Sequence, residues 1–203
     1  MLNTKYIVIN GNLPPVENKY RLGNAWFAKN VVPANNANEE INALEAINPA
    51  VDAVVSREFL SQESFMAFAR SQMMQGFMDG TADMSLNNFI ELASYAPNRM
   101  VYNYSSDRPQ IVLFSEVYYN PGWKATITPA NGGESKNLDI FRANWILRGA
   151  IVPKGDYTIE FTFNPPCFGV GEMYSRISSG ILVLLLLGGI GVAAWRRKGA
   201  KTE

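Results

Sequence analysis

The segment Ile177–Trp195 reads ISSGILVLLLLGGIGVAAW and contains no charged residue. Its length of about 19 residues is close to the ~20 that a helix needs to cross the hydrocarbon core of a bilayer. Arg176 precedes the segment, and four cations follow it within 196–203. Cationic flanks usually stay on the cytoplasmic side of a membrane. The pattern therefore predicts a transmembrane helix over 177–195 and a basic cytoplasmic tail over 196–203. The alternative is a buried core helix of a soluble protein.

This orientation would leave the residues before the helix outside the cytoplasm. Met1–Asn10 lacks the basic start, long apolar run and cleavage site of a signal peptide. We therefore expect the chain to be the C-terminal part of a polytopic membrane protein, whose earlier spans carry this region across. The alternative is a self-standing envelope module with a single span, which binds or supports without enzymatic activity.

The charge balance excludes several classes of function. The chain has 18 basic and 18 acidic residues, of which four basic and one acidic lie in 196–203, so the rest holds 14 and 17. A region without basic excess gives no support for nucleic-acid binding. There is no histidine and one cysteine, Cys167, which excludes histidine-based triads, Cys/His zinc sites and intramolecular disulfides. We expect no cofactor, whereas carboxylate chemistry stays open.

Residues 1–87 carry mixed patterns and predict a small α/β part. A helix over Asn38–Ile47 is indicated by Asn38 as N-cap and by the acids that follow it. A second helix is expected over Ser61–Met78, where a methionine-rich stripe either fills a core or touches lipid or a partner. The expected strands are Leu2–Ile9, Gly23–Ala28 and Val51–Phe59.

From Asn88 onward the apolar period changes to two, which predicts an antiparallel β-sandwich over 88–166. A linker over 167–176 would then lead to the membrane helix. The fold class expected for the whole chain is thus α+β. The predicted strands are centred on Phe89–Leu92, Met100–Tyr104, Ile111–Phe114, Trp123–Ile127, Leu138–Phe141, Ile146–Val152 and Tyr157–Phe163.

The densest group of functional side chains surrounds the Pro121-Gly122 turn. Glu116, Tyr118, Tyr119 and Trp123 lie within a few residues of this turn. An aromatic ring can stack on the apolar face of a sugar, and a carboxylate can accept hydrogen bonds from its hydroxyl groups. The group therefore predicts a carbohydrate platform. The alternative is that these aromatic residues only cover the end of the sandwich.

Arg142 and Arg148 fall in neighbouring predicted strands. Either could pair with Glu116 or hold a phosphate through two parallel hydrogen bonds. An internal ion pair is the simpler interpretation. Asp139, Glu116 and Glu160 show no spacing that would define a glycosidase pair, so no catalytic residue is assigned.

Six segments resemble, in this order, the C-terminal part of the YfhO-family bacterial membrane proteins, and of Bacteroidetes members in particular. The most specific is Phe114–Ala125, which reads FSEVYYNPGWKA. The others are Leu2–Val8, Leu22–Phe27, Tyr95–Tyr102, Phe141–Gly149 and Val152–Phe161. The loop Pro129–Asn137 departs from the tighter Asp-Gly turn expected in the family.

The resemblance implies an extracytoplasmic domain that follows many membrane helices, in a protein of the bacterial inner membrane. The family is similar to integral-membrane glycosyltransferases that use polyprenyl-phosphate sugars. Their catalytic acid is expected in an early loop outside this sequence, so no catalytic residue carries over. The partners implied are the lipid bilayer, the other transmembrane helices of the same full-length protein, and a carbohydrate or polyprenyl-phosphate sugar.

Overall fold

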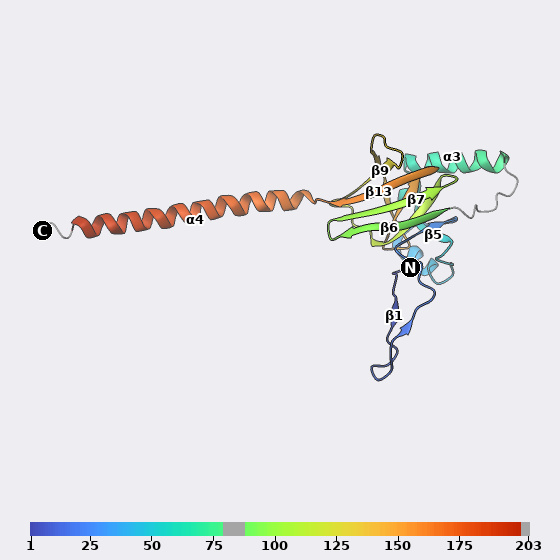
Figure 1. Ribbon diagram of the computed structural model, residues 1–203, viewed down its shortest axis with the longest axis horizontal. Helices are drawn as coiled ribbons and strands as arrows, with labels where there is room; N and C mark the ends of the chain where they lie inside the picture. The colour runs from blue at the N-terminus through green and yellow to red at the C-terminus, as the bar shows by residue number, and fades with distance from the viewer. Residues whose placement is uncertain (79–87, 200–203) are drawn as a thin grey trace. The chain divides into compact units, whose positions relative to one another are not determined.

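The structure, a computed structural model, describes residues 1–78 and 88–199 (Figure 1). It divides into two compact units, Met1–Phe163 and Asn164–Glu203. The first contains β-sheets with short helices and the second is a long helix, so the predicted α+β class is confirmed.

Two sheets and a small hairpin make up the strands of the first unit. Their orders are β10-β9-β13-β7-β6 for a five-stranded sheet and β3-β8-β12-β11-β5-β4 for a six-stranded sheet, with β1 and β2 paired separately. The strands are β1 (Tyr6–Ile7), β2 (Val16–Glu17), β3 (Ala25–Ala28), β4 (Asn30–Ala34), β5 (Asp52–Ser56), β6 (Phe89–Ala96), β7 (Arg99–Ser106), β8 (Gln110–Val117), β9 (Trp123–Pro129), β10 (Lys136–Leu138), β11 (Ile140–Ala143), β12 (Leu147–Val152) and β13 (Gly155–Phe163). The helices are α1 (Ala37–Ala43), α2 (Arg57–Leu60), α3 (Glu63–Met78) and α4 (Pro166–Gly199).

Strand β8 is buried on both faces and forms part of two hydrophobic cores. Because successive side chains of a strand point to opposite faces, Val112 and Phe114 join the core shared with β7, β9 and β13. Ile111 and Leu113 join a second core that includes Phe65 of α3. The six-stranded sheet is therefore a middle layer, with the five-stranded sheet on one side and α3 on the other.

Strands from both sides of the expected boundary at residue 87 share the six-stranded sheet. β3 pairs with β8, and β5 pairs with β11. β4 and β5 are parallel and are connected through α1. The N-cap of α1 is Asn36, whose side-chain oxygen accepts a hydrogen bond of 3.0 Å from the Glu39 amide, so the prediction of Asn38 as N-cap was wrong.

The single strand predicted over Leu138–Phe141 is two strands that belong to different sheets. β10 pairs with β9 in the five-stranded sheet, whereas β11 pairs with β12 in the six-stranded sheet. Asp139 lies between them, so the chain crosses from one sheet to the other at this residue. A continuous strand pattern conceals such a crossing because both halves are extended.

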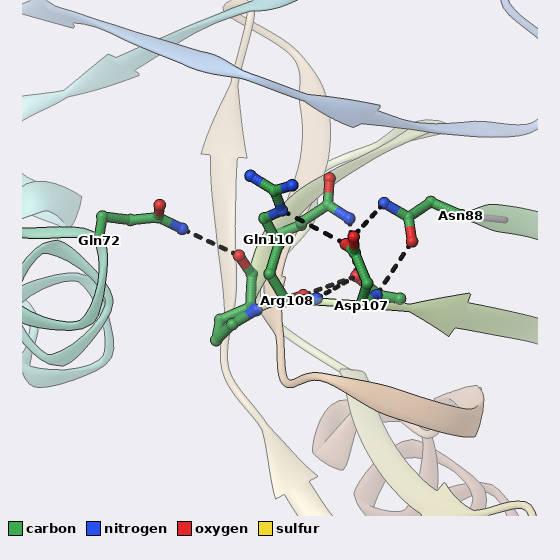
Figure 2. A network of polar contacts seen from close by, with 7 residues as sticks. Gln72, Asn88, Asp107, Arg108 and Gln110 are labelled. Carbon is green, nitrogen blue, oxygen red and sulfur yellow. Dashed lines mark hydrogen bonds and ion pairs between the residues drawn. The ribbon is translucent and has the colours of Figure 1, made fainter. Parts of the chain in front are cut away.

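A polar network fixes the β7–β8 turn to its neighbours, as Figure 2 shows. Asn88 and Asp107 exchange two hydrogen bonds of 2.9 and 3.0 Å, and Arg108 Nε lies 3.3 Å from the same carboxylate. The hydrogen bond from Asn88 holds the pKa of Asp107 below its usual value. Gln72 of α3 donates to the Pro109 carbonyl oxygen at 3.0 Å. The network thus connects α3 and the start of β6 to one turn.

Helix α4 is continuous and includes the residues 167–176 that were expected as a linker. Its segment Cys167–Val192 is long and apolar enough to cross a membrane. Glu172 and Arg176, one turn apart, form an ion pair inside this segment. Residues 200–203 of the predicted basic tail lie outside the described part of the chain, as do the side chains of Met73, Met74 and Met78 from the methionine stripe.

Candidate carbohydrate site

A cleft of about 520 Å³ opens where β9 and β10 pass the β8–β9 connection. Its aromatic lining consists of Tyr118 and Trp123. Its polar and aliphatic lining is Gln62, Asn120, Lys124, Ala125, Asn137, Leu138, Asp139 and Ile140. The volume lies within the range of small-molecule sites, and the lining is more polar than that of a typical apolar ligand pocket.

The buried guanidinium group of Arg148 stacks on the Trp123 ring. The Arg148 Cζ atom lies 4.5 Å from the centre of the Trp123 ring and 4.7 Å from the centre of the Phe161 ring. Phe163 packs against Trp123 at a centroid distance of 5.0 Å. Stacking of this kind restricts the indole, because a planar cation over an aromatic face is electrostatically favourable. The cleft therefore presents a pre-ordered aromatic surface.

Arg148 has fewer hydrogen bonds than a buried cation usually makes. Its side chain is buried, its Nη2 atom donates to the Val117 carbonyl oxygen at 3.2 Å, and Nε and Nη1 have no hydrogen-bond partner within the described residues. Burial lowers the pKa of Arg148, and the charge of Glu116 opposes this shift. The two aromatic faces and the nearby carboxylate compensate the charge in place of direct hydrogen bonds.

Glu116 reaches this position because of an irregularity between β8 and β12. The pairing shifts between Leu147 and Arg148, so Ser115 and Glu116 have no partner in β12. Bulges of this type redirect side chains and are frequent near functional sites. Burial raises the pKa of Glu116 and the Arg148 guanidinium counteracts this rise. The carboxyl thus lies close to Arg148 without forming a short ion pair with it.

Of the predicted site residues, only Tyr118 and Trp123 line the cleft; Glu116 and Arg148 are not part of its lining, and Tyr119 and Arg142 lie elsewhere. Tyr119 is exposed, and its ring is 6.3 Å from that of Phe163 rather than in the cleft lining. Arg142 donates from Nη2 to Glu40 Oε2 at 2.9 Å, which is an internal ion pair, although with a different partner from the predicted Glu116. The fully buried Glu40 also accepts a hydrogen bond of 2.9 Å from the Trp145 amide.

The Glu40–Arg142 pair stabilises the β11–β12 turn. Asn144 and Trp145 in this turn have positive φ angles of 47° and 71°. Asn144 accepts a hydrogen bond of 2.7 Å from the Val54 amide and donates its own amide to the Val54 carbonyl oxygen at 2.8 Å. Since Glu40 binds both Arg142 Nη2 and the Trp145 amide, Arg142 has a structural role at this turn.

Sequence reasoning named none of the five polar residues that line the cleft as site residues; these are Gln62, Asn120, Lys124, Asn137 and Asp139. Asp139 lies between Leu138 and Ile140, as a polar residue does in an ordinary alternating strand, so no sequence signal marks its position at the crossing. Gln62 follows α2, and no local pattern connects this segment to the β8–β9 connection.

Within residues 1–78 and 88–199, no three histidine, cysteine, aspartate or glutamate residues gather as a metal site would need. Glu160 is paired with Arg99 through two hydrogen bonds of 2.7 and 2.9 Å, which lower the pKa of its carboxyl. The arrangement therefore favours binding through stacking and hydrogen bonds.

Comparisons with protein-family models, curated proteins and solved structures find no match.

Proposed function

We propose that this chain is the membrane-anchored, extracytoplasmic sugar-binding part of a YfhO-like protein, and that it assists the transfer of sugars from a polyprenyl-phosphate donor to a cell-surface polymer. The single observation that carries the proposal is the cleft in which Trp123, stacked on Arg148, lies beside a set of polar side chains.

The cleft chemistry supports a saccharide ligand. Trp123 offers an apolar face for a pyranose ring, and Tyr118 adds a second aromatic ring with a hydroxyl group. Asn120, Asn137 and Asp139 supply acceptors and donors for sugar hydroxyl groups. Because the indole is already fixed, less conformational entropy is lost when a ligand binds.

The second unit supports a location at a membrane. Cys167–Val192 forms a helix that is apolar over a length sufficient for a bilayer. Gly188 and Gly189 leave open space beside this helix, which favours close approach of other helices. Such neighbours would be the remaining spans of the full-length protein, where the chemical step would occur.

A test removes the indole and retains the rest of the cleft. The chain is reconstituted into nanodiscs and titrated with maltopentaose, cellopentaose and chitopentaose, and binding is followed by calorimetry. We expect Trp123→Ala to weaken binding of the preferred oligosaccharide roughly fivefold to tenfold, because one stacked ring contributes about 1 to 1.5 kcal/mol. Asp139→Asn, which removes the charge and keeps the size of the side chain, should weaken binding less.

The matched control is Tyr119→Ala, since Tyr119 is an exposed aromatic residue outside the cleft lining. This variant should bind as the parent chain does. Circular dichroism verifies that each variant is folded. Equal affinities for the parent and for folded Trp123→Ala and Asp139→Asn variants would refute the site, and so would normal sugar transfer by the Trp123→Ala variant of the full-length protein.

A further inference from the structure

The β1–β2 hairpin exposes an unusual number of large apolar side chains. Those of Tyr6, Ile7, Val8, Ile9, Leu13, Val16 and Tyr20 are all exposed, with Ile9 at 77% and Tyr20 at 92%. Figure 1 shows the hairpin extending away from the two sheets. Exposed apolar groups of this density indicate a contact with another molecule or with lipid.

The apolar residues occupy both faces of the hairpin. Tyr6 and Ile7 are consecutive residues of β1 and both side chains are exposed, and consecutive residues of a strand point in opposite directions. A flat protein partner would cover one face and leave the other in water. A surrounding apolar medium, such as the outer region of a lipid layer, covers both.

The hairpin is ordered by its own hydrogen bonds. At the tip the amides of Asn12 and Leu13 donate to the side-chain and main-chain oxygens of Asn10 at 3.0 and 3.1 Å. At the base the Asn18 amide donates to the Lys5 carbonyl oxygen at 2.8 Å. Because the ladder is short, several main-chain groups of the hairpin must form hydrogen bonds with water or lipid headgroups. The hairpin therefore suits the membrane interface and not the centre of the hydrocarbon core.

The two ends of the hairpin are fixed to the domain. The Ser115 hydroxyl group lies 2.9 Å from the Met1 carbonyl oxygen and 2.7 Å from the Gly23 carbonyl oxygen. The Asn3 side chain donates to that of Asn24 at 2.7 Å. Because β8 holds both ends, the apolar residues project from a defined position on the domain.

The charges around the hairpin indicate which kind of membrane surface it would contact. Lys5, Lys19 and Arg21 lie at its base and are exposed, against one acid, Glu17. Two tyrosines, Tyr6 and Tyr20, lie next to these cations in the sequence. Cations and tyrosines beside aliphatic residues are the composition of segments that lie at an anionic membrane surface.

We propose that the β1–β2 hairpin is a membrane-contact element that places its aliphatic side chains at headgroup depth in an anionic phospholipid bilayer, with Lys5, Lys19 and Arg21 on the lipid phosphates. This contact does not depend on the sugar site. It would give the domain a second attachment to the bilayer besides α4.

The test uses the whole chain inserted in vesicles of phosphatidylglycerol and phosphatidylcholine in equal parts. Cys167 is replaced by serine, and an environment-sensitive nitrobenzoxadiazole label is attached to Ile9→Cys. We expect blue-shifted emission that is quenched by spin-labelled phosphatidylcholine. The same label at Glu134→Cys, in the exposed β9–β10 loop, should show neither effect.

The charge requirement is tested on the same label. Combining Lys5→Gln, Lys19→Gln and Arg21→Gln should abolish most of the quenching, and so should vesicles of phosphatidylcholine alone. Water-like emission at position 9 would overturn the proposal. Blue-shifted emission without lipid quenching would also overturn it, because a protein surface would then cover the hairpin. Equal quenching in the triple glutamine variant, or in vesicles of phosphatidylcholine alone, would overturn the assignment to an anionic surface.

Discussion

Glu116 is an ionisable residue in a place that does not favour its charge. Its side chain is half-buried beside the Arg148–Trp123 stack, and burial raises the pKa of its carboxyl more than Arg148 lowers it. Folding therefore shifts the protonation equilibrium of Glu116 toward the neutral acid, relative to the unfolded chain. A residue that costs stability in its ionised form is frequently one that a binding site requires.

The pH dependence of stability tests this interpretation. Because the folded carboxyl of Glu116 holds its proton more tightly than the unfolded one, the free energy of unfolding falls as the pH rises above the ordinary pKa of 4.5. Glu116→Gln removes this loss. We expect the variant to become more stable relative to the parent chain as the pH increases from about 4 to 7, as measured by urea unfolding in nanodiscs.

Glu160→Gln is the control with the opposite sign. The pKa of Glu160 is lowered by its hydrogen bonds with Arg99, so its contribution to stability is lost as the pH falls below 4.5. This variant should lose stability relative to the parent chain as the pH rises through that range. The same trend for both variants would contradict the assignment of Glu116.

Some contacts between residues can be predicted from the sequence, and others cannot. Tyr118 and Trp123 could be predicted as neighbours because one short turn separates them, and both line the cleft. The contact between Glu40 and Arg142 joins residues 102 positions apart. No periodicity connects them, because the contact depends on how α1 packs beside the β11–β12 turn.

At the level of elements, the β11–β12 hairpin depends on one glycine. Gly149 is the cross-strand partner of Phe141, whose ring lies over it. A Cβ atom at position 149 would be 2.5 Å from Phe141 Cε2. The ring has little room to move, because it is buried and packs edge-on against Phe65 at 4.7 Å.

Gly149→Ala should therefore destabilise the first unit by about 1–3 kcal/mol, the usual cost of overpacking. Urea unfolding followed by tryptophan fluorescence measures it. Gly11→Ala is the matched control, since no atom lies within 4 Å of the added Cβ. Adding Phe141→Leu should reduce the cost of Gly149→Ala. A Gly149→Ala variant as stable as Gly11→Ala would show that the ring moves freely.

Strands were predicted well where one face is buried and poorly at the edges. Met100, Tyr102 and Tyr104 alternate with more exposed residues, and β7 follows this alternation. β4 was missed because Pro33 weakens its strand pattern, yet β4 is an edge strand, where proline is tolerated. β1 is shorter than the predicted Leu2–Ile9 because it pairs with β2, which has two residues.

For the whole molecule, the length of α4 bears on where its charges lie. Cys167–Val192 spans 26 residues, or about 39 Å at ~1.5 Å per residue, against ~30 Å for a bilayer core. Charged residues are costly in the hydrocarbon and much cheaper at the interface. The Glu172–Arg176 pair therefore belongs at one interface, which would place Cys167 outside the bilayer.

Cys167 is the single cysteine of the chain and is exposed, so it reports the orientation directly. If the domain is extracytoplasmic, a membrane-impermeant maleimide should label Cys167 in intact spheroplasts, and Cys167→Ser should abolish labelling. Thr202→Cys in the serine background should react only after permeabilisation, because the cations that precede it resist translocation. The reverse pattern would place the domain in the cytoplasm and remove its access to a cell-surface polymer.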